Sequence, residues 1–381
     1  MLMPFYAPGR DRLSVVIVGG GYSGLAALIA LREHRPDAEI VLVDPRAHHC
    51  KITHLHKSFR QPLADFFVPF QALARRFNFR HIQAELPVND NLLKQWNTNR
   101  KLTVGEQVLE FDYLLMATGA ERRATEKTDG MMDLDDFAAQ SGPELLEKHL
   151  DNSGERCLTV VGGGATGVQY LFEIAHFLRE RRTSCRIRLV DAEPAPLSQF
   201  PLKLGRYVES RISDLEIDYM PNCFFRSQAS GQVVLEGRET GELIELPSDL
   251  SLLFTGKSPT PRFQADLFGH IVVNAKTLDA VFTAGDCSHY RGPGSNAATA
   301  QSAVRKGRLV ARNILRASGP LKVPEPYLHR DLGYVISMGP RDAVGWIALQ
   351  RNVVAGFAAD VVKDLVEAQY DLLLDGIDTL L

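Results

Sequence analysis

Two stretches of the chain repeat one pattern of apolar and polar positions. In residues 14–44 and again in residues 158–191, an unbroken aliphatic run leads into closely spaced glycines, a segment with helical periodicity, and a second apolar run that ends on an aspartate. Apolar runs without alternation are typical of parallel strands that are buried on both faces. The pattern therefore predicts two strand–helix–strand units of a doubly wound α/β fold.

The glycines of both units follow the spacing G-x-G-x-x-G. They are, in chain order, Gly19, Gly21, Gly24, Gly162, Gly164 and Gly167. In this motif the first glycine permits a tight turn, the second lets a pyrophosphate approach the backbone, and the third lets the helix pack closely on the strand. Because the helix N-terminus also offers unpaired N–H groups to phosphates, each unit predicts a dinucleotide site.

Each unit ends its second strand on an acid, Asp44 in the first and Asp191 in the second, where a carboxylate can accept hydrogen bonds from a ribose diol. Shorter segments recur too: residues 112–119 (DYLLMATG) match residues 249–256 (DLSLLFTG), and alternating residues before each predict small antiparallel strands. Corresponding pieces keep their order at a spacing of about 140 residues, so the chain contains two homologous units rather than a solenoid.

Composition narrows the function classes. With 381 residues, 45% hydrophobic and 23% charged, the chain has room for two or three globular domains. A net charge of −3 gives no broad attraction for nucleic acid, which is not an expected partner. Without an apolar run of about 18 residues or a secretory leader, we expect a cytoplasmic protein with no transmembrane segment. The five cysteines form no close pair, so no disulfide framework or zinc ribbon is expected.

These features resemble the two-dinucleotide-binding-domain flavoproteins, the pyridine nucleotide-disulfide oxidoreductase superfamily. The resemblance rests on both glycine motifs, on the ATG of residues 117–119, and on residues 277–287 (TLDAVFTAGDC) with the helix that follows them. It implies that the first motif holds FAD and the second holds NAD(P)H. The implied FAD contacts are Gly19, Gly21, Gly24, Asp44, Ala117, Thr118, Gly119, Gly285 and Asp286, and the implied NAD(P)H contacts are Gly162, Gly164, Gly167 and Asp191. A helix-cap role is the alternative for Asp286.

The resemblance also implies a glutathione-reductase-like architecture, in which the second Rossmann-like domain is inserted into the first. We expect a discontinuous FAD-binding domain over residues 10–120 and 255–325, an NAD(P)H-binding domain over residues 121–254, and a small C-terminal region over residues 326–381.

Within the superfamily, the sequence most resembles type II NADH dehydrogenases and apoptosis-inducing-factor-like flavoproteins, which pass electrons from NAD(P)H through FAD to quinones or other small acceptors. The first motif has no nearby cysteine pair, and no cysteine follows Cys287, so a disulfide relay and sulfide:quinone chemistry are both disfavoured. Two positions depart from the usual pattern: Gln169 stands where a glutamate is usual, and Lys306 where a second glutamine is usual near the quinone.

Residues 48–56 (HHCKITHLH) form a histidine-rich segment just after Asp44. Its spacing fits no tetrahedral zinc pattern, so no metal is expected. The resemblance places this segment beside the flavin, and His54 and His56 are therefore candidates for proton exchange near neutral pH. Lys306 is the third catalytic candidate, because a cation there would favour an anionic acceptor or stabilise the negative reduced flavin.

The last periodic segment, residues 353–374, is amphipathic, and from residue 353 onward six acids face one lysine. Because anionic lipid repels this charge, peripheral membrane contact is disfavoured, and we expect the apolar stripe to pack on the body or in a homodimer.

The sequence thus predicts an FAD-dependent oxidoreductase that takes hydride from NAD(P)H, with NADH favoured by Asp191, and passes electrons to a quinone or another small acceptor without a redox disulfide. The alternative is an NAD(H)-responsive flavoprotein sensor or partner-binding protein with little turnover.

Overall fold

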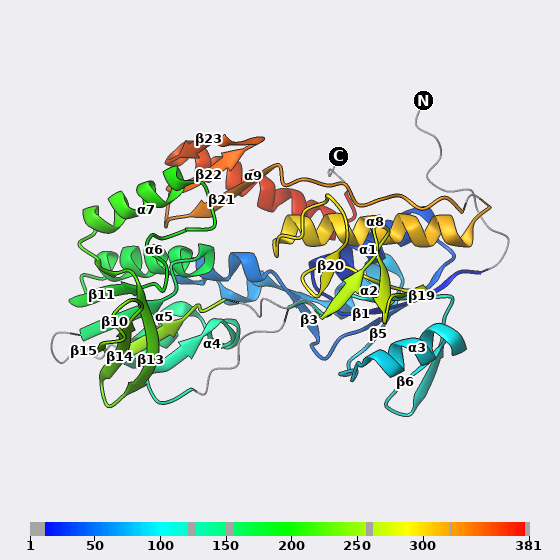
Figure 1. Cartoon of the computed structure of the whole chain (residues 1–381), viewed down its shortest axis with the longest axis horizontal. Helices are drawn as coiled ribbons and strands as arrows, with labels where there is room; N and C mark the ends of the chain where they lie inside the picture. Colours follow the sequence, from blue (N-terminus) through cyan, green and yellow to red (C-terminus); the bar gives the residue numbers. More distant parts are fainter. Residues whose placement is uncertain (1–11, 121–126, 150–155, 257–261, 321, 378–381) are drawn as a thin grey trace.

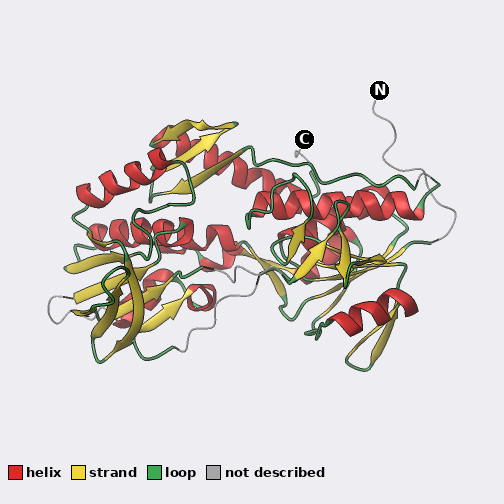
Figure 2. Ribbon diagram, in the orientation of Figure 1, coloured by secondary structure: helices red, strands yellow, loops and turns green. Residues whose placement is uncertain are grey.

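The structure is a computed structural model, and it describes residues 12–120, 127–149, 156–256, 262–320 and 322–377. Two lobes lie side by side along the long axis of the molecule, each with helices packed on a sheet (Figures 1 and 2). This arrangement confirms the predicted α/β class with two Rossmann-like units.

The first lobe is built on an eight-stranded sheet whose central strands are parallel. Its strands, in spatial order, are β20 (Ser288–Tyr290), β17 (Phe263–Ala265), β18 (His270–Val273), β19 (Lys276–Thr283), β8 (Tyr113–Met116), β1 (Ser14–Val18), β2 (Glu39–Val43) and β5 (Arg80–Ile82). These strands come from the chain on both sides of the second lobe, so the second lobe is inserted into the first. The exact domain limits stay a prediction.

Helices cover both faces of this sheet, because its central strands are apolar on both sides. They are α1 (Tyr22–His34), α2 (Phe70–Phe77) and α8 (Ala300–Ser318) on one face, and α3 (Asp90–Asn99) with the hairpin of β6 (Lys101–Val104) and β7 (Gln107–Glu110) on the other. The hairpin confirms the strands predicted from alternation. Helices α1 and α8 pack tightly because Gly307 has no side chain: a Cβ there would lie 2.1 Å from the Ser23 carbonyl oxygen.

The second lobe repeats the plan on a five-stranded parallel sheet. Its strands, in spatial order, are β12 (Asp218–Met220), β11 (Cys185–Val190), β10 (Arg156–Val161), β16 (Leu250–Leu253) and β9 (Met131–Asp133). Around it lie α4 (Leu134–Ala139), α5 (Gly142–His149), α6 (Ala165–Glu180), α7 (Leu202–Asp214) and the antiparallel strands β13 (Cys223–Ala229), β14 (Gln232–Gly237) and β15 (Leu243–Pro247). Strands β14 and β15 are the alternating segment predicted before the second unit's TG.

A segment of the first lobe reaches the second lobe. It consists of β3 (His48–Cys50), the 3-10 helices η1 (Ile52–Phe59) and η2 (Leu63–Phe66), and β4 (Phe67–Pro69). Phe59 of η1 packs its ring against Tyr170 and Phe177 of α6, with centroids 6.4 and 5.5 Å apart. The histidine-rich segment therefore lies between the lobes.

The C-terminal region bridges both lobes (Figure 1). It consists of the antiparallel strands β21 (Gly333–Ser337), β22 (Ala343–Ile347) and β23 (Leu349–Ala355), followed by α9 (Phe357–Leu374). The sheet lies over the second lobe, where Tyr207 and Arg211 of α7 bond to Asp342 at 2.8 and 2.9 Å. Helix α9 runs on to the first lobe, where Tyr370 packs on Tyr22 of α1.

The orientation of α9 corrects part of one expectation. The body leaves large apolar side chains of the predicted stripe uncovered, among them Phe357 at 63% and Leu365 at 64% exposure, although Leu373 is buried at 2%. The homodimer contact stays a prediction. The side of α9 that is buried on the body consists of Ala359, Lys363, Tyr370, Leu373 and Leu374. Beside it, Asp371 pairs with Lys51 at 3.0 Å and Asp364 pairs with Lys57 at 3.0 Å. Lysines of the first lobe thus neutralise acids that the sequence alone left unpaired. Among the residues that the structure describes, none of the helices has the length and apolar character that crossing a bilayer requires.

Candidate dinucleotide sites

The register of the first sheet gathers the predicted residues at one edge. Val18 pairs with Val43 on one side and with Met116 on the other, and Met116 pairs with Thr283. The strands are parallel, so the first glycine turn, Asp44, the ATG of residues 117–119 and the Gly285–Asp286 step all follow strand ends at this edge. In doubly wound folds, ligands bind outside this carboxyl edge.

In the first glycine turn, the three glycines have the different surroundings that the motif predicts. Gly19 has φ +108°, and a Cβ there would lie 2.2 Å from the Ala117 carbonyl oxygen; at Gly24 a Cβ would lie 1.9 Å from the carbonyl oxygen of Gly19. At Gly21, by contrast, a Cβ would meet none of the described atoms within 4 Å. The outer two glycines are therefore needed by the fold, whereas Gly21 faces open space at the N-terminus of α1. This geometry fits a pyrophosphate.

The second glycine turn has the same geometry. Gly162 also has φ +108°, with a Cβ position 2.5 Å from the Phe254 carbonyl oxygen, and at Gly167 a Cβ would lie 1.9 Å from the Gly162 carbonyl oxygen. The nearest described atom to a Cβ at Gly164 is the side-chain nitrogen of Gln199, at 3.7 Å. Both turns can therefore accept a dinucleotide.

Asp44 is 2% exposed and is already engaged. Its carboxylate accepts from the Gly20 N–H at 2.7 Å and pairs with Arg46 at 3.0 Å. Burial raises the pKa of Asp44, but the bonds from Arg46 and Gly20 outweigh it and hold the pKa below its usual value. Sequence reasoning missed Arg46, a half-exposed side chain that pairs with the acid expected to bind the ribose. The available clue was that Arg46 lies two residues after Asp44 in the sequence.

Asp191 lies against the second turn, since a Cβ at Gly163 would be 2.0 Å from its carboxylate. Burial raises the pKa of Asp191, although backbone N–H groups bond to it. Nearby, Arg188 forms an ion pair with Asp218 at 2.9 Å, and Arg238 forms one with Glu193 at 3.1 Å. The arginine on this strand that is closest to Asp191 in sequence, Arg188, therefore points to another partner.

Asp286 and Lys306, which both follow β19 in the sequence, differ in burial. Asp286 is half-buried at the sheet edge, after Gly285, which has φ +84°. Lys306 is 1% exposed; its Nζ donates to the Ser288 carbonyl oxygen at 3.1 Å and to Asn296 Oδ1 at 3.0 Å. Burial lowers the pKa of Lys306 to about 8. Its catalytic role stays a prediction, and its contacts are those of a side chain that holds the loop after β20.

The two catalytic histidines of the prediction are also buried. His54 Nε2 lies 3.4 Å from Glu367 of α9, and His56 Nε2 lies 3.5 Å from the amide nitrogen of Gln169 on α6. Burial lowers the pKa of His54 to about 4 and that of His56 well below its usual value. Both rings are neutral near pH 7, which does not favour proton exchange there, and their catalytic role stays a prediction.

The histidine that touches the glycine turn is His49, which the prediction did not single out. Its Nδ1 lies 3.0 Å from the Gly20 carbonyl oxygen. Within the described residues, no three His, Cys, Asp or Glu side chains are arranged to hold a metal ion.

Comparison with known proteins agrees with this geometry. A family model described as pyridine nucleotide-disulphide oxidoreductase matches residues 13–307. A type II NADH:quinone oxidoreductase of Staphylococcus aureus is 25% identical, and the alignment covers 97% of each chain.

Solved structures share the fold. NDH2 from Plasmodium falciparum, in complex with NADH, superposes with a TM-score of 0.77 at 14% identity, covering 93% of this chain and 94% of that one. The sulfide:quinone oxidoreductase of Aquifex aeolicus gives 0.74 at 18% identity, covering 96% and 92%. The chain belongs to the pyridine nucleotide-disulphide oxidoreductase family, as its paired glycine motifs predicted.

Proposed function

We propose that the chain is an NADH-oxidising flavoprotein that holds FAD at the first glycine turn and NADH at the second, and passes electrons to a quinone. The observation that carries this proposal is the pair of glycine turns with one geometry, each leaving its middle glycine, Gly21 or Gly164, open at the N-terminus of a helix. The relationship to a type II NADH:quinone oxidoreductase along nearly the whole chain supports the choice of acceptor.

Bound FAD would supply the chemistry, accepting hydride from the nicotinamide and giving electrons onward. The chain's own residues would bind and orient the two dinucleotides. Backbone N–H groups and the positive end of α1 would meet the pyrophosphate beside Gly21. Asp44 and Arg46 would hold the adenosine ribose, and Asp286 the ribityl chain. In the second lobe, Asp191 would accept from a 2′-hydroxyl and repel a 2′-phosphate, which favours NADH.

We also propose that the exposed side of α9 contacts a lipid bilayer, where hydrophobic quinones reside. It presents the apolar stripe of Phe357, Val361, Leu365, Val366 and Leu372. Three of the acids that argued against lipid, Asp364, Glu367 and Asp371, pair with lysines of the first lobe. Since Asp364 stays 62% exposed beside the stripe, we expect attachment through apolar burial that does not need anionic lipid.

The test separates the two half-reactions. Under anaerobic conditions, NADH should bleach the flavin absorbance of the purified protein, and a soluble short-chain quinone should restore it. In the steady state, NADH oxidation with that quinone should exceed about 1 per second, the low end for ordinary enzymes. Bleaching without reoxidation and turnover far below that rate would favour the sensor alternative; an absence of bound flavin would reject both.

A further inference from the structure

Both polar groups of Gly20, in the middle of the first glycine turn, are held by side chains from outside the turn. The N–H donates to Asp44 at 2.7 Å, and the carbonyl oxygen lies 3.0 Å from His49 Nδ1. The Cα position is also fixed, because a Cβ there would lie 2.2 Å from the ring of Phe70. The peptide groups beside Gly21 are therefore set from three directions.

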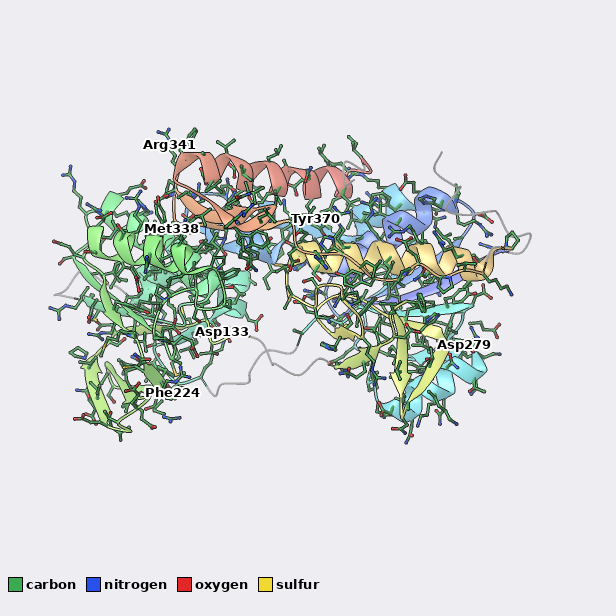
Figure 3. All side chains as sticks on the ribbon, turned by 45° about the horizontal axis from the view of Figure 1, so that its top comes forward. Asp133, Phe224, Asp279, Met338, Arg341 and Tyr370 are labelled. Carbon is green, nitrogen blue, oxygen red and sulfur yellow. The ribbon has the colours of Figure 1, made fainter. Side chains whose placement is uncertain are left out.

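His49 is held in turn by the C-terminal helix. Its Nε2 lies 3.0 Å from the hydroxyl of Tyr370, which lies on the side of α9 that faces the first lobe (Figure 3). Both side chains are buried, at 1% and 8% exposure. The ring of Tyr22 packs against both, with centroids 5.1 Å from His49 and 4.5 Å from Tyr370.

The chemistry of these groups gives the hydrogen bonds a direction. A carbonyl oxygen only accepts, so Nδ1 of His49 carries the hydrogen. Burial lowers the pKa of His49 to about 4, which keeps the ring neutral and makes Nε2 an acceptor at neutral pH. The Tyr370 hydroxyl therefore donates to His49, and His49 donates to Gly20. Two residues after His49 and one residue after Tyr370, Lys51 and Asp371 pair at 3.0 Å and fasten α9 beside this contact.

The second glycine turn offers an internal comparison. There the equivalent carbonyl, that of Gly163, accepts from the backbone N–H of Leu197 at 2.8 Å, within its own lobe. The first turn is thus linked to the C-terminal helix, whereas the second is held locally.

We propose that Tyr370 is a positioning residue for the flavin dinucleotide: through His49 it fixes the peptide groups of the first glycine turn, at which the pyrophosphate binds. This inference rests on the proposed function, which assigns FAD to the first turn. It makes α9, at the far end of the sequence, part of the FAD site.

The variant Tyr370→Phe removes the hydroxyl and keeps the ring. Apoprotein titrated with FAD, followed by flavin fluorescence, should bind about two- to tenfold more weakly than the parent, the effect of one lost hydrogen bond. Tyr207→Phe is the matched control, since it removes a hydroxyl bond to Asp342 that joins the C-terminal sheet to the second lobe. It should leave FAD affinity within about twofold, and neither variant should change the affinity for NADH, followed by NADH fluorescence.

A double-mutant cycle tests the route through His49. His49→Phe should weaken FAD binding at least as much as Tyr370→Phe, and adding Tyr370→Phe should weaken it no further. Additive losses, an unchanged FAD affinity in Tyr370→Phe, or an equal loss of NADH affinity would overturn the inference. If the unaltered chain binds no FAD, the proposed function fails instead, so the two failures are distinguishable.

Discussion

The guanidinium of Arg60 and the carboxylate of Glu173 lie 2.7 Å apart and join the two lobes. Glu173 is 2% exposed on α6, and Arg60 directly follows η1 of the first lobe. Arg60 also donates through Nε, so the contact is a forked, charge-assisted one.

Replacement of Glu173 by glutamine should lower the free energy of unfolding by roughly 1–3 kcal/mol, because it breaks a pair whose carboxylate is buried while the guanidinium keeps some contact with water. Urea unfolding measures this loss. Glu110→Gln is the control: its partner, Lys101, lies 2.6 Å away with both side chains more than half exposed, and the change should stay below about 0.5 kcal/mol. Equal losses in both variants would show that burial does not set the strength of the Arg60–Glu173 contact.

As the pH is lowered, the apoprotein should lose stability at pH values above those at which its carboxylates become protonated. The pKa values of His49 and His54 are lowered to about 4 in the folded chain, so as the pH falls from 6.5 the unfolded state takes up protons that the folded state refuses. The contribution of these neutral histidines to the free energy of unfolding is therefore fully present above pH 6.5. It is lost as the pH falls toward 4, by about 3 kcal/mol for each histidine at the lower limit. Urea midpoints between pH 7.5 and 4.5 should fall along this course, and His54→Gln should flatten it; a midpoint that is constant down to pH 5 would contradict buried neutral histidines.

Much of the fold was readable from the sequence, because the glycine turns depend on local constraints. Gly19 has a φ of +108°, and a Cβ at Gly24 would lie 1.9 Å from the carbonyl oxygen of Gly19, so the spacing of these two glycines is required within the turn itself. The environment of Lys306 was not readable, since its partners Ser288 and Asn296 reach it only after the loop folds back. The amphipathic pattern of α9 predicted two faces but not which one faces the body, because the partners of α9, Lys51 and Lys57 among them, lie some 300 residues away in the sequence.

Helix α9 should attach the protein to neutral lipid vesicles. In flotation with phosphatidylcholine vesicles, Leu365→Asp should reduce the bound fraction at least about tenfold, since it places a charge where an apolar side chain would be buried. Leu243→Asp on β15 is the matched control, because Leu243 is 62% exposed against 64% for Leu365 and because β15 lies away from α9 (Figure 1). High salt should not release the protein. The opposite outcome is a chain that does not float and that sediments as a dimer. If Leu365→Asp disrupts that dimer, the stripe contacts a second copy of the chain instead.

The second site should prefer NADH over NADPH by about 5- to 150-fold in kcat/KM, equivalent to about 1–3 kcal/mol for one mismatched buried partner. The reason is the carboxylate of Asp191, which is 9% exposed beside the second turn. Asp191→Asn should reduce the preference, whereas Asp218→Asn, which removes the carboxylate that pairs with Arg188, should leave it unchanged. Equal kcat/KM values for both nucleotides in the unaltered chain would exclude this role for Asp191.

The most direct test of two nucleotides at two turns compares Gly21→Val with Gly164→Val. Neither substitution meets described protein atoms closer than 3.7 Å at the Cβ position, so each should act mainly on the ligand. We measure bound FAD by absorbance and then the anaerobic bleaching of that FAD by NADH. Gly21→Val should lose FAD, while Gly164→Val should keep FAD and lose reduction by NADH. Full flavin content with normal bleaching in Gly21→Val, or loss of FAD in Gly164→Val alone, would contradict the assignment of FAD to the first turn.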